Sequence, residues 1–450
     1  LSGLTRGANG TTAAIHSSGA VVTEAAGYAG WGAAPSGDIV TAPGLWSLDN
    51  FGNKLIATIF SGETFTWSSD ATDATATRAA LASGAPTASR DMLVSTPDRH
   101  LVFFGTETTI GTKSSQDQMF IRFSSQEDIT DYTPTATNSA GTQRLADGSR
   151  IMGALRGRNA IYVWTDTALF LMRFVGAPFT FAFEQVGTNC GLIGKNAAVE
   201  VDGTVYWMSE NGFFKYGGQL ESLPCLVEDF VFDDLNTVTK QHVNAGLNNL
   251  FGEINWFYVS SGSNTVNRVV TYNYFDSSAQ RPIWTTGTLD RTAWADSAIF
   301  GKPHATQYDT STNGTSGSST YIEGNTDGVS IYYEHETGLN QVKEGTESAI
   351  AANIESGDFD ISITKQGGAS TDGDGEYMMK ISRVIPDFLA QTGDATVTLQ
   401  LRDFPTDVEA SSALGPFTVT TSTKKIDTRA RARAISLKVS NTSTSQFWKL

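Results

Sequence analysis

Histidine and cysteine, the residues most often used in catalysis and metal binding, are few and scattered in this sequence. The five histidines stand singly at positions 16, 100, 242, 304 and 335, and the cysteines are Cys190 and Cys225. After His335-Glu336, Leu339 stands where a zinc-binding H-E-x-x-H helix requires a second histidine. A phosphate-binding G-x-x-x-x-G-K-[ST] loop and a G-x-S-x-G nucleophile elbow are also absent from the sequence. We therefore expect no catalytic, cofactor-binding or metal-binding residues.

Acidic residues cluster in two places without the spacing of a known site. Glu228-Asp229 and Asp233-Asp234 lie in the best helix candidate, residues 224–235, and are expected to be solvated charges. Residues 372–376 resemble a calcium loop in composition, but their spacing departs from that of such loops, which favours a polar turn. A glycosidase would need two carboxylates at a defined separation, and no repeated motif provides them.

One basic stretch has a spacing that could bind an anion. On a strand, alternate residues point to the same face, so three arginines would lie on one face and alanines 430, 432 and 434 on the other. Neighbouring guanidinium groups repel unless a carboxylate or a phosphate lies between them. In an acidic protein, carboxylates of a neighbouring subunit are the simpler partner; contact with DNA and a plain solvated strand are the alternatives. We predict an interface at Lys424, Lys425, Arg429, Arg431 and Arg433.

The overall charge and the sparse cysteines limit the class of protein. The formal net charge is −16, which argues against nucleic-acid binding over the whole surface but not against a local basic patch. Two cysteines are too few for a disulfide framework, so free thiols in a reducing cytoplasm are expected. We find no run of 18 apolar residues, and we predict no membrane-spanning segment.

The elements that must position these residues follow a repeating hairpin pattern. Residues 160–174 and 204–216 each read as an aromatic-rich strand, a tight polar turn and a second aromatic strand. Similar units begin at apolar residues spaced 44 to 60 positions apart: Leu55, Leu101, Ile161, Val205, Ile254 and Ile299. Four-stranded propeller blades recur at about 40–50 residues. The spacing predicts an all-β fold with a β-propeller of about six blades, and an ordinary β-sandwich is the alternative.

Changes in composition divide the chain into three parts. Residues 1–43 are rich in glycine, alanine and threonine and are predicted to form an extended arm or irregular strands. Residues 44–338 are assigned to the propeller, with an inserted loop near 114–144 and a strand at 328–336 that could close the ring with the first blade. Period-two alternation in residues 339–450 predicts a smaller C-terminal β-sandwich-like domain.

Several segments resemble stretches of tail proteins of tailed bacteriophages: residues 122–128, 183–198, 231–234, 291–294, 425–433 and 448–450. The chain is similar to the propeller-containing tail nozzle proteins of short-tailed phages, also described as tail tubular or packaged-DNA stabilisation proteins. This resemblance implies a structural virion protein of the tail, made in the host cytoplasm and without catalytic residues.

The resemblance also implies partners. A nozzle subunit would form a ring with copies of itself, a hexamer, below the portal and adaptor, and would line or close the conduit through which genomic DNA passes. Two alternatives stay open: an adjoining tail stopper or hub protein, and a carbohydrate-binding propeller module for host-surface recognition. The second rests on the 47 aromatic residues, which the strand pattern assigns mainly to the core.

Overall fold

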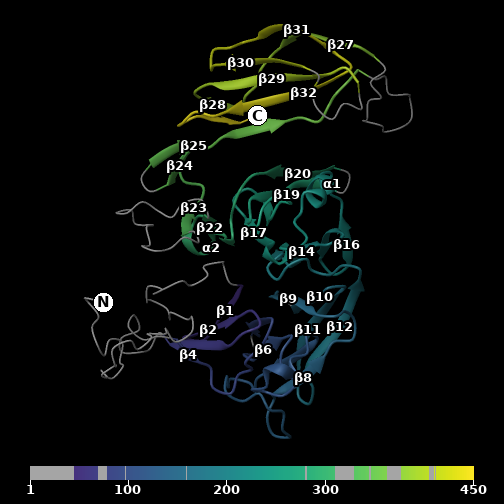
Figure 1. Cartoon of the computed structure of the whole chain (residues 1–450), viewed down its shortest axis with the longest axis vertical. Coiled ribbons are helices and arrows are strands. Elements are labelled where there is room, and N and C mark those ends of the chain that lie inside the picture. Colours follow the sequence, from purple (N-terminus) through teal and green to yellow (C-terminus); the bar gives the residue numbers. More distant parts are fainter. Residues whose placement is uncertain are drawn as a thin grey trace, which may run out of the picture. The chain divides into compact units, whose positions relative to one another are not determined.

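The computed structural model describes residues 45–68, 79–96, 98–158, 160–278, 281–309, 329–343, 346–361, 377–404, 410 and 412–449. The chain is all-β: a β-propeller is followed by a smaller β-sandwich-like domain (Figure 1). It divides into two compact units, residues 1–335 and 336–450, so the division lies near the predicted limit at 338. The predicted arm, residues 1–43, lies outside the described residues.

The first three blades are four-stranded antiparallel sheets of consecutive strands. Blade 1 holds β1 (Trp46–Phe51), β2 (Lys54–Ile59), β3 (Thr64–Ser68) and β4 (Ala80–Leu81). Blade 2 holds β5 (Asp91–Val94), β6 (Leu101–Phe104), β7 (Phe120–Phe123) and β8 (Gly141–Arg144). Blade 3 holds β9 (Ile151–Arg156), β10 (Ile161–Thr165), β11 (Ala168–Gly176) and β12 (Thr180–Thr188).

The next three blades continue this order, and the sixth has three strands among the described residues. Blade 4 holds β13 (Ala198–Val201), β14 (Thr204–Ser209), β15 (Gly212–Tyr216) and β16 (Leu220–Leu223). Blade 5 holds β17 (Asn244–Asn248), β18 (Glu253–Tyr258), β19 (Arg268–Ser278) and β20 (Arg281–Gly287). Blade 6 holds β21 (Ala293–Ala295), β22 (His304–Asp309) and β23 (Val329–Glu334).

The hairpin spacing located the second strand of five blades correctly. Leu55, Leu101, Ile161, Val205 and Ile254 lie in β2, β6, β10, β14 and β18. The sixth assignment was wrong, because Ile299 lies in the short helix α2 (Ser297–Phe300), which ends at Gly301 in the left-handed conformation (φ 77°). The second strand of blade 6 begins later, at His304.

Two further expectations are corrected by the strand pairing. The inserted loop predicted near 114–144 contains β7 and β8, so the long connection shrinks to residues 124–140. The strand predicted at 328–336 is present as β23, but it pairs with β22 and not with a strand of blade 1. Every blade in the described part of the chain is therefore built from its own consecutive strands.

The few helices are short. The candidate helix at 224–235 is present as α1 (Glu228–Asp233), which places Val231 in the core. Two 3-10 turns, η2 (Lys113–Ser115) and η3 (Lys240–His242), complete the described set. Among the described residues, we find no helix that is both long and apolar enough to cross a membrane.

The propeller core is built from aromatic side chains on the middle strands. Trp164, Trp207 and Trp256 are fully buried, and the ring centres of Trp164 and Trp207 are 5.5 Å apart. The indole nitrogens of Trp207 and Trp256 donate to backbone oxygens of Cys190 and Ala197, which lie in the crossing between blades 3 and 4. The indoles thus hold neighbouring blades together as well as filling space.

The described residues of the second unit form one four-stranded sheet and three strand pairs. The sheet has the order β26 (Ala352–Glu355), β32 (Ala434–Asn441), β29 (Ala395–Arg402) and β30 (Ser412–Val419). The pairs are β27 (Met379–Val384) with β31 (Ile426–Ala432), β24 (Asn340–Lys343) with β25 (Thr346–Ala349), and β28 (Ala390–Thr392) with β33 (Phe447–Lys449). Met379, Ala430 and Ala432 pack the β27–β31 pair onto Leu399 and Leu401 of the sheet, which forms the core of the sandwich.

Candidate functional site

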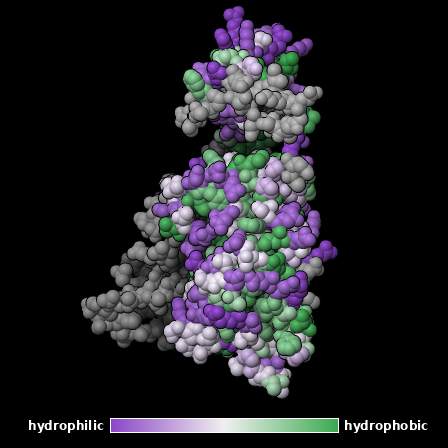
Figure 2. Space-filling view, turned by 90° about the vertical axis from the view of Figure 1, so that its right-hand side faces the viewer, coloured by the Kyte–Doolittle hydropathy of each residue, from purple (hydrophilic) through white to green (hydrophobic). Residues whose placement is uncertain are grey.

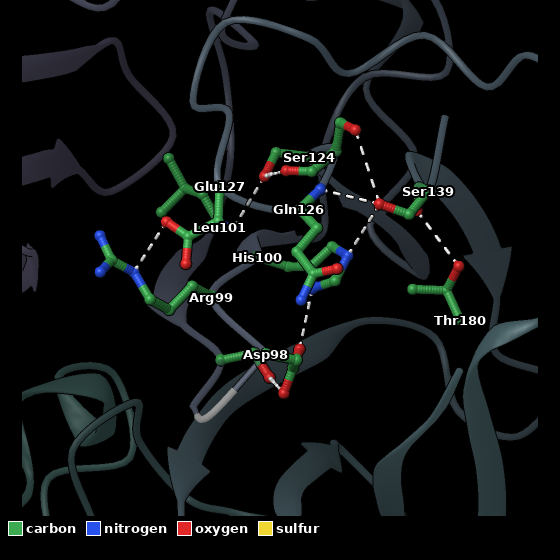
Figure 3. Close-up of polar contacts among 11 residues, drawn as sticks. Asp98, Arg99, His100, Leu101, Ser124, Gln126, Glu127, Ser139 and Thr180 are labelled. Carbon is green, nitrogen blue, oxygen red and sulfur yellow. Dashed lines mark hydrogen bonds and ion pairs between the residues drawn. The ribbon is translucent and has the colours of Figure 1, made fainter. Parts of the chain in front are cut away.

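A serine, a histidine and an aspartate meet in blade 2 in an arrangement that the sequence did not reveal (Figure 3). His100 Nδ1 lies 2.8 Å from Asp98 Oδ2, and His100 Nε2 lies 3.2 Å from Ser139 Oγ. Asp98 and His100 belong to the turn between β5 and β6, whereas Ser139 comes from the long β7–β8 connection. These contacts match the order of a nucleophile, a base and an orienting carboxylate.

Burial and hydrogen bonds define the state of this group. His100 is fully buried and is surrounded by the rings of Phe123, Phe174 and Phe181, the nearest of which is centred 5.2 Å away. Burial alone would raise the pKa of Asp98, but hydrogen bonds from His100 and from Ser95 hold it below its usual value. Asp98 is therefore a buried carboxylate that accepts from two side chains.

The surroundings of Ser139 indicate a clamp and not a nucleophile. Its Oγ accepts from the Gln126 backbone N–H at 2.8 Å and also contacts His100 Nε2 and, at 3.5 Å, Ser125 Oγ. With the bond to its own Cβ, these three neighbours fill the directions around a hydroxyl oxygen. Figure 3 also shows Thr180, whose Oγ1 donates to the Ser139 carbonyl at 3.2 Å. The cluster thus fastens the β7–β8 connection to the β5–β6 turn and to β12.

A second polar group lies where the first strands of the blades meet. Asp91, at the start of β5, is 4% exposed and receives bonds from three directions. Its Oδ1 accepts from Ser47 Oγ of β1 at 2.8 Å and lies 3.2 Å from Lys195 Nζ, which precedes β13. Its Oδ2 accepts from the Ala154 backbone N–H of β9 at 2.8 Å. One carboxylate thus links blades 1, 2 and 3 with the crossing that leads to blade 4.

Asp49, which lies two residues after Ser47 in β1, links blades in the same way. Its Oδ2 accepts from the Val94 backbone N–H of blade 2 at 2.8 Å and pairs with Arg156 of blade 3 at 2.7 Å. Arg156 also donates to the Val94 carbonyl at 2.8 Å. We refer to Ser47, Asp49, Asp91, Arg156 and Lys195 as the axial cluster. Its carboxylates are engaged by donors from the same chain, which suits structural linkage.

Two cavities adjoin the axial cluster. One, of about 270 Å³, is lined by residues of blades 3 to 6 that include Trp164, Asn196, Asn244 and Trp294. The other, of about 350 Å³, is lined by β1, β5 and β9, and both cavities contact Lys195. The Asn244 Oδ1 and Trp164 Nε1 atoms are buried without a hydrogen-bond partner among the described residues. A buried polar atom of this kind is normally satisfied by water or by a ligand.

The basic stretch of the second unit forms the strand that its alternation predicted. In β31, Arg429 and Arg431 are exposed, whereas Ala430 and Ala432 are fully buried. Arg433 is half-buried at the junction of β31 and β32. Two of the three predicted arginines therefore lie on the exposed face of β31, and the third follows the end of the strand.

The exposed face of the β27–β31 pair is strongly positive. Lys380 lies directly opposite Arg431 in the register, so two cations are neighbours across the strands. Asp427 is the acidic side chain on this face among the described residues. It bonds to Lys425 at 2.8 Å and to Arg383 at 2.9 Å, and these bonds lower the Asp427 pKa. We call this face, with Lys380, Arg383, Lys425, Arg429 and Arg431, the cationic ribbon. In the described part of the chain, no carboxylate pairs with Arg429 or Arg431.

The surface around the cationic ribbon is exposed. Lys424, the fifth predicted interface residue, is exposed in the turn that leads into β31. In Figure 2, long hydrophilic side chains stand out at the top of the view, where Figure 1 labels β27 and β31. The cationic ribbon is therefore open to a partner.

Other sequence expectations can be placed as well. The acidic pairs at 228–229 and 233–234 lie on and beside α1, and Asp234 forms an ion pair with Arg268 at 3.2 Å. Residues 372–376 lie outside the described part. Within the described part, no group of three or more histidine, cysteine or acidic side chains is arranged to hold a metal ion.

Comparison with known proteins identifies no family for this chain. No protein-family model matches the sequence, and no curated protein matches it either. Similar solved structures include a dihydro-heme d1 dehydrogenase, NirN, with 10% identity and a TM-score of 0.36 over 59% of this chain and 51% of that one. This chain therefore spans about half the length of NirN.

Two other similar structures are bacterial. BamB from Moraxella catarrhalis has 12% identity and a TM-score of 0.34 over 65% of this chain and 82% of its own. AztD from Citrobacter koseri has 8% identity and a TM-score of 0.30 over 54% and 75%. With identities of 8–12% and TM-scores of 0.30–0.36, these likenesses carry no argument about function.

Proposed function

We propose that this chain is a structural subunit of the tail of a short-tailed bacteriophage, a nozzle protein that forms a ring and lines or closes the DNA exit conduit. The observation that carries the proposal is the cationic ribbon, whose exposed Arg429 and Arg431 have no carboxylate partner in the described part of a chain with a net charge of −16. Such a surface fits the acidic surface of another copy.

The charge distribution favours contact between unlike faces. If the cationic ribbon of one subunit meets an acidic face of the next, the contact is heterologous. Repeating it closes a ring when the rotation between neighbours divides a full turn. The guanidinium fork suits paired carboxylates on a neighbour, and desolvation would strengthen each pair relative to a solvated one. The proposed ring is a hexamer, as the resemblance to nozzle proteins implies.

The axial cluster also suits a structural part. In an enzyme with a propeller fold, we would look for available carboxylates near the axis. Here, Asp49 and Asp91 accept from donors of several blades, and using either in acid-base chemistry would break those links. In the proposed role, these carboxylates hold neighbouring blades in fixed positions.

The proposal includes partners and a location. The ring would lie in the virion tail beneath the portal and adaptor. Genomic DNA would pass through the ring transiently. Because a polyanion is held less strongly where fewer cations meet its phosphates, a strongly acidic subunit suits passage without adhesion.

Assembly of a triple variant tests the role of the ribbon. Changing Arg429 and Arg431 of the ribbon, together with Arg433 just beyond the end of β31, to Ser should weaken ring formation while the unfolding temperature of the monomer changes little. Mass photometry and negative-stain imaging of the full chain measure ring formation. Lys438→Ser, which removes a half-buried lysine paired with Glu355 in the same unit, is the matched control. Rings that form equally well in the triple variant would refute the proposed interface.

The tail role itself is tested on virions. Antibody labelling of purified phage particles should mark the tail, at the level of the nozzle. Labelling at an adjoining position would favour the stopper or hub alternative, and absence of the protein from particles would refute a virion role. Six-fold images of the purified protein would support the hexamer.

A further inference from the structure

A basic residue stands just before the first strand of each of five blades. Arg90, Arg150, Lys195, Lys240 and Arg291 precede β5, β9, β13, β17 and β21 by one to four residues. Because the first strands of neighbouring blades contact one another, their beginnings lie together. Four of these cations line a single cavity of about 210 Å³: Arg90, Arg150, Lys195 and Lys240.

The remaining wall of the cavity adds no negative charge. It is formed by apolar and amide side chains, namely Leu45, Phe60, Met152, Ile193, Val238 and Gln241. The guanidinium carbon of Arg90 lies 4.8 Å from the centre of the Phe60 ring, which holds the arginine side chain in place. The cavity is therefore a positively charged recess with a partly apolar wall.

The acidic neighbours of these cations are already engaged. Asp91 pairs with Lys195, and Glu210 pairs with Lys240. Asp166 accepts from the backbone and side chain of Ser149. These carboxylates offset part of the positive charge but leave the two arginines without an ion pair.

Arg150 is the least satisfied of the four cations. Its guanidinium group makes no hydrogen bond and no ion pair with a described residue, and its Nε is buried. Arg90 donates to neutral groups only, through Nε to the Ile151 carbonyl at 2.6 Å and through Nη1 to the Gln118 side chain at 2.9 Å.

The repulsion between the arginines is visible in their electrostatics. Burial and then the nearby Arg150 lower the pKa of Arg90 to about 10, and the smaller effects of Asp166 and Asp91 offset only part of this. Two poorly paired guanidinium groups beside one cavity are a costly arrangement unless an anion lies between them.

We propose that this cavity binds a small oxyanion of the phosphate or sulfate class, held by the Arg90 and Arg150 guanidinium groups with Lys195 and Lys240 nearby. The volume is below the 300–1,000 Å³ of pockets for drug-sized ligands. It suits one tetrahedral anion and a few waters, each water taking about 30 Å³. Arginine forks are well matched to such oxygens.

The bound oxyanion would act as a link between blades. Arg90 leads into blade 2, Arg150 into blade 3, Lys195 into blade 4 and Lys240 into blade 5. An anion that contacts all four would join the entrances of four blades. Asp91 makes a similar link, but its carboxylate is part of blade 2 and not a separate ligand. This inference does not depend on the proposed role in a phage tail.

Phosphate titration of the full chain tests the proposal. Inorganic phosphate should raise the unfolding temperature above that in chloride of equal ionic strength, because a ligand that binds only the folded state stabilises it. Calorimetry should give a saturable isotherm with one site per chain. Sulfate should compete with phosphate, since it presents the same tetrahedral oxygens.

Arg150→Ala should weaken phosphate affinity by about tenfold or more, the effect of losing a charge-assisted contact of about 1.4 kcal/mol. Without phosphate, its unfolding temperature should equal or exceed that of the wild type, because repulsion with Arg90 is relieved. Arg173→Ala, which removes an exposed arginine paired with Glu184, should keep the wild-type affinity. If Arg150→Ala does not fold, Arg150→Lys keeps the charge without the fork and should bind severalfold more weakly.

Three results would overturn the proposal. Phosphate and chloride could have the same effect at equal ionic strength, or both Arg150 variants could bind phosphate like the wild type. A DNA oligonucleotide could also stabilise the protein while free phosphate does not, which would indicate a polyanion surface elsewhere.

Discussion

His335 should make the propeller sensitive to mild acid. It follows β23 at the end of the first unit, and its Nε2 accepts a hydrogen bond from Arg291 Nε at 2.9 Å. Acceptance requires that Nε2 carries no proton. Protonation would remove this bond and place two cations in direct contact, so the folded state favours the neutral ring.

The pKa of His335 gives the size of the effect. Burial, then Arg291 and His304, lower it from 6.5 to about 4. The unfolded chain takes up the proton near pH 6.5, whereas the folded chain takes it up only near pH 4. The contribution to stability is therefore complete above pH 6.5 and is lost as the pH falls toward 4, by about 3 kcal/mol in total.

Denaturant unfolding of the full chain between pH 7.5 and 4, followed by tryptophan fluorescence, measures this loss. Eight of the nine tryptophans lie in the first 335 residues, so the signal reports mainly on the propeller. His335→Gln keeps an acceptor for Arg291 but cannot be protonated, and its stability should fall by about 3 kcal/mol less than that of the wild type over this range. His304→Gln is the control and should retain most of the pH dependence. Identical pH profiles for wild type and His335→Gln would refute the reasoning.

Three substitutions test other parts of the propeller. Asp91→Ala leaves Lys195 buried without its carboxylate and should lower the free energy of unfolding by about 3 kcal/mol or more in urea titration. Ser139→Ala should cost about 1 kcal/mol and leave any hydrolysis of activated esters unchanged, whereas a serine-dependent burst would identify a nucleophile. Gly246→Ala would place a methyl group 2.5 Å from the Trp294 ring and should cost about 1–3 kcal/mol, and wild-type thermal stability in this variant would contradict so close an approach of the indole to the β17 backbone.

The sequence predicts the blades well because each is a local unit. Strand–turn–strand patterns with aromatic side chains appear within about 15 residues, so Ile161 and Val205 locate their strands without knowledge of distant contacts. The alternation from Arg429 to Ala434 is equally local, and it correctly separates an exposed face from a buried one in β31. Blade 6 was misplaced because Ile299 has the apolar neighbours of a strand, but Gly301 ends a helical turn there.

The polar groups escape sequence reasoning because their members are far apart. Ser139 is 39 residues from His100, and no local pattern marks it as the partner of the histidine. Asp91 and Lys195 belong to different blades and meet only when the first strands converge. The basic residues before the first strands carry a usable signal, since Arg90 and Arg150 each stand directly before an apolar strand, but it is recognised only after the blade register is known.

In the described propeller blades, strands pair only with their neighbours in sequence, and this has a consequence for synthesis. Each described blade can fold once its own strands have left the ribosome, without waiting for the last part of the chain. The axial links cannot, because Ser47 and Lys195 are 148 residues apart. At about 5–20 residues per second, the first blade waits roughly 7–30 s for that lysine. Until then, the Asp91 carboxylate lacks its ion pair with Lys195 and is held by Ser47 and the Ala154 backbone of the earlier blades.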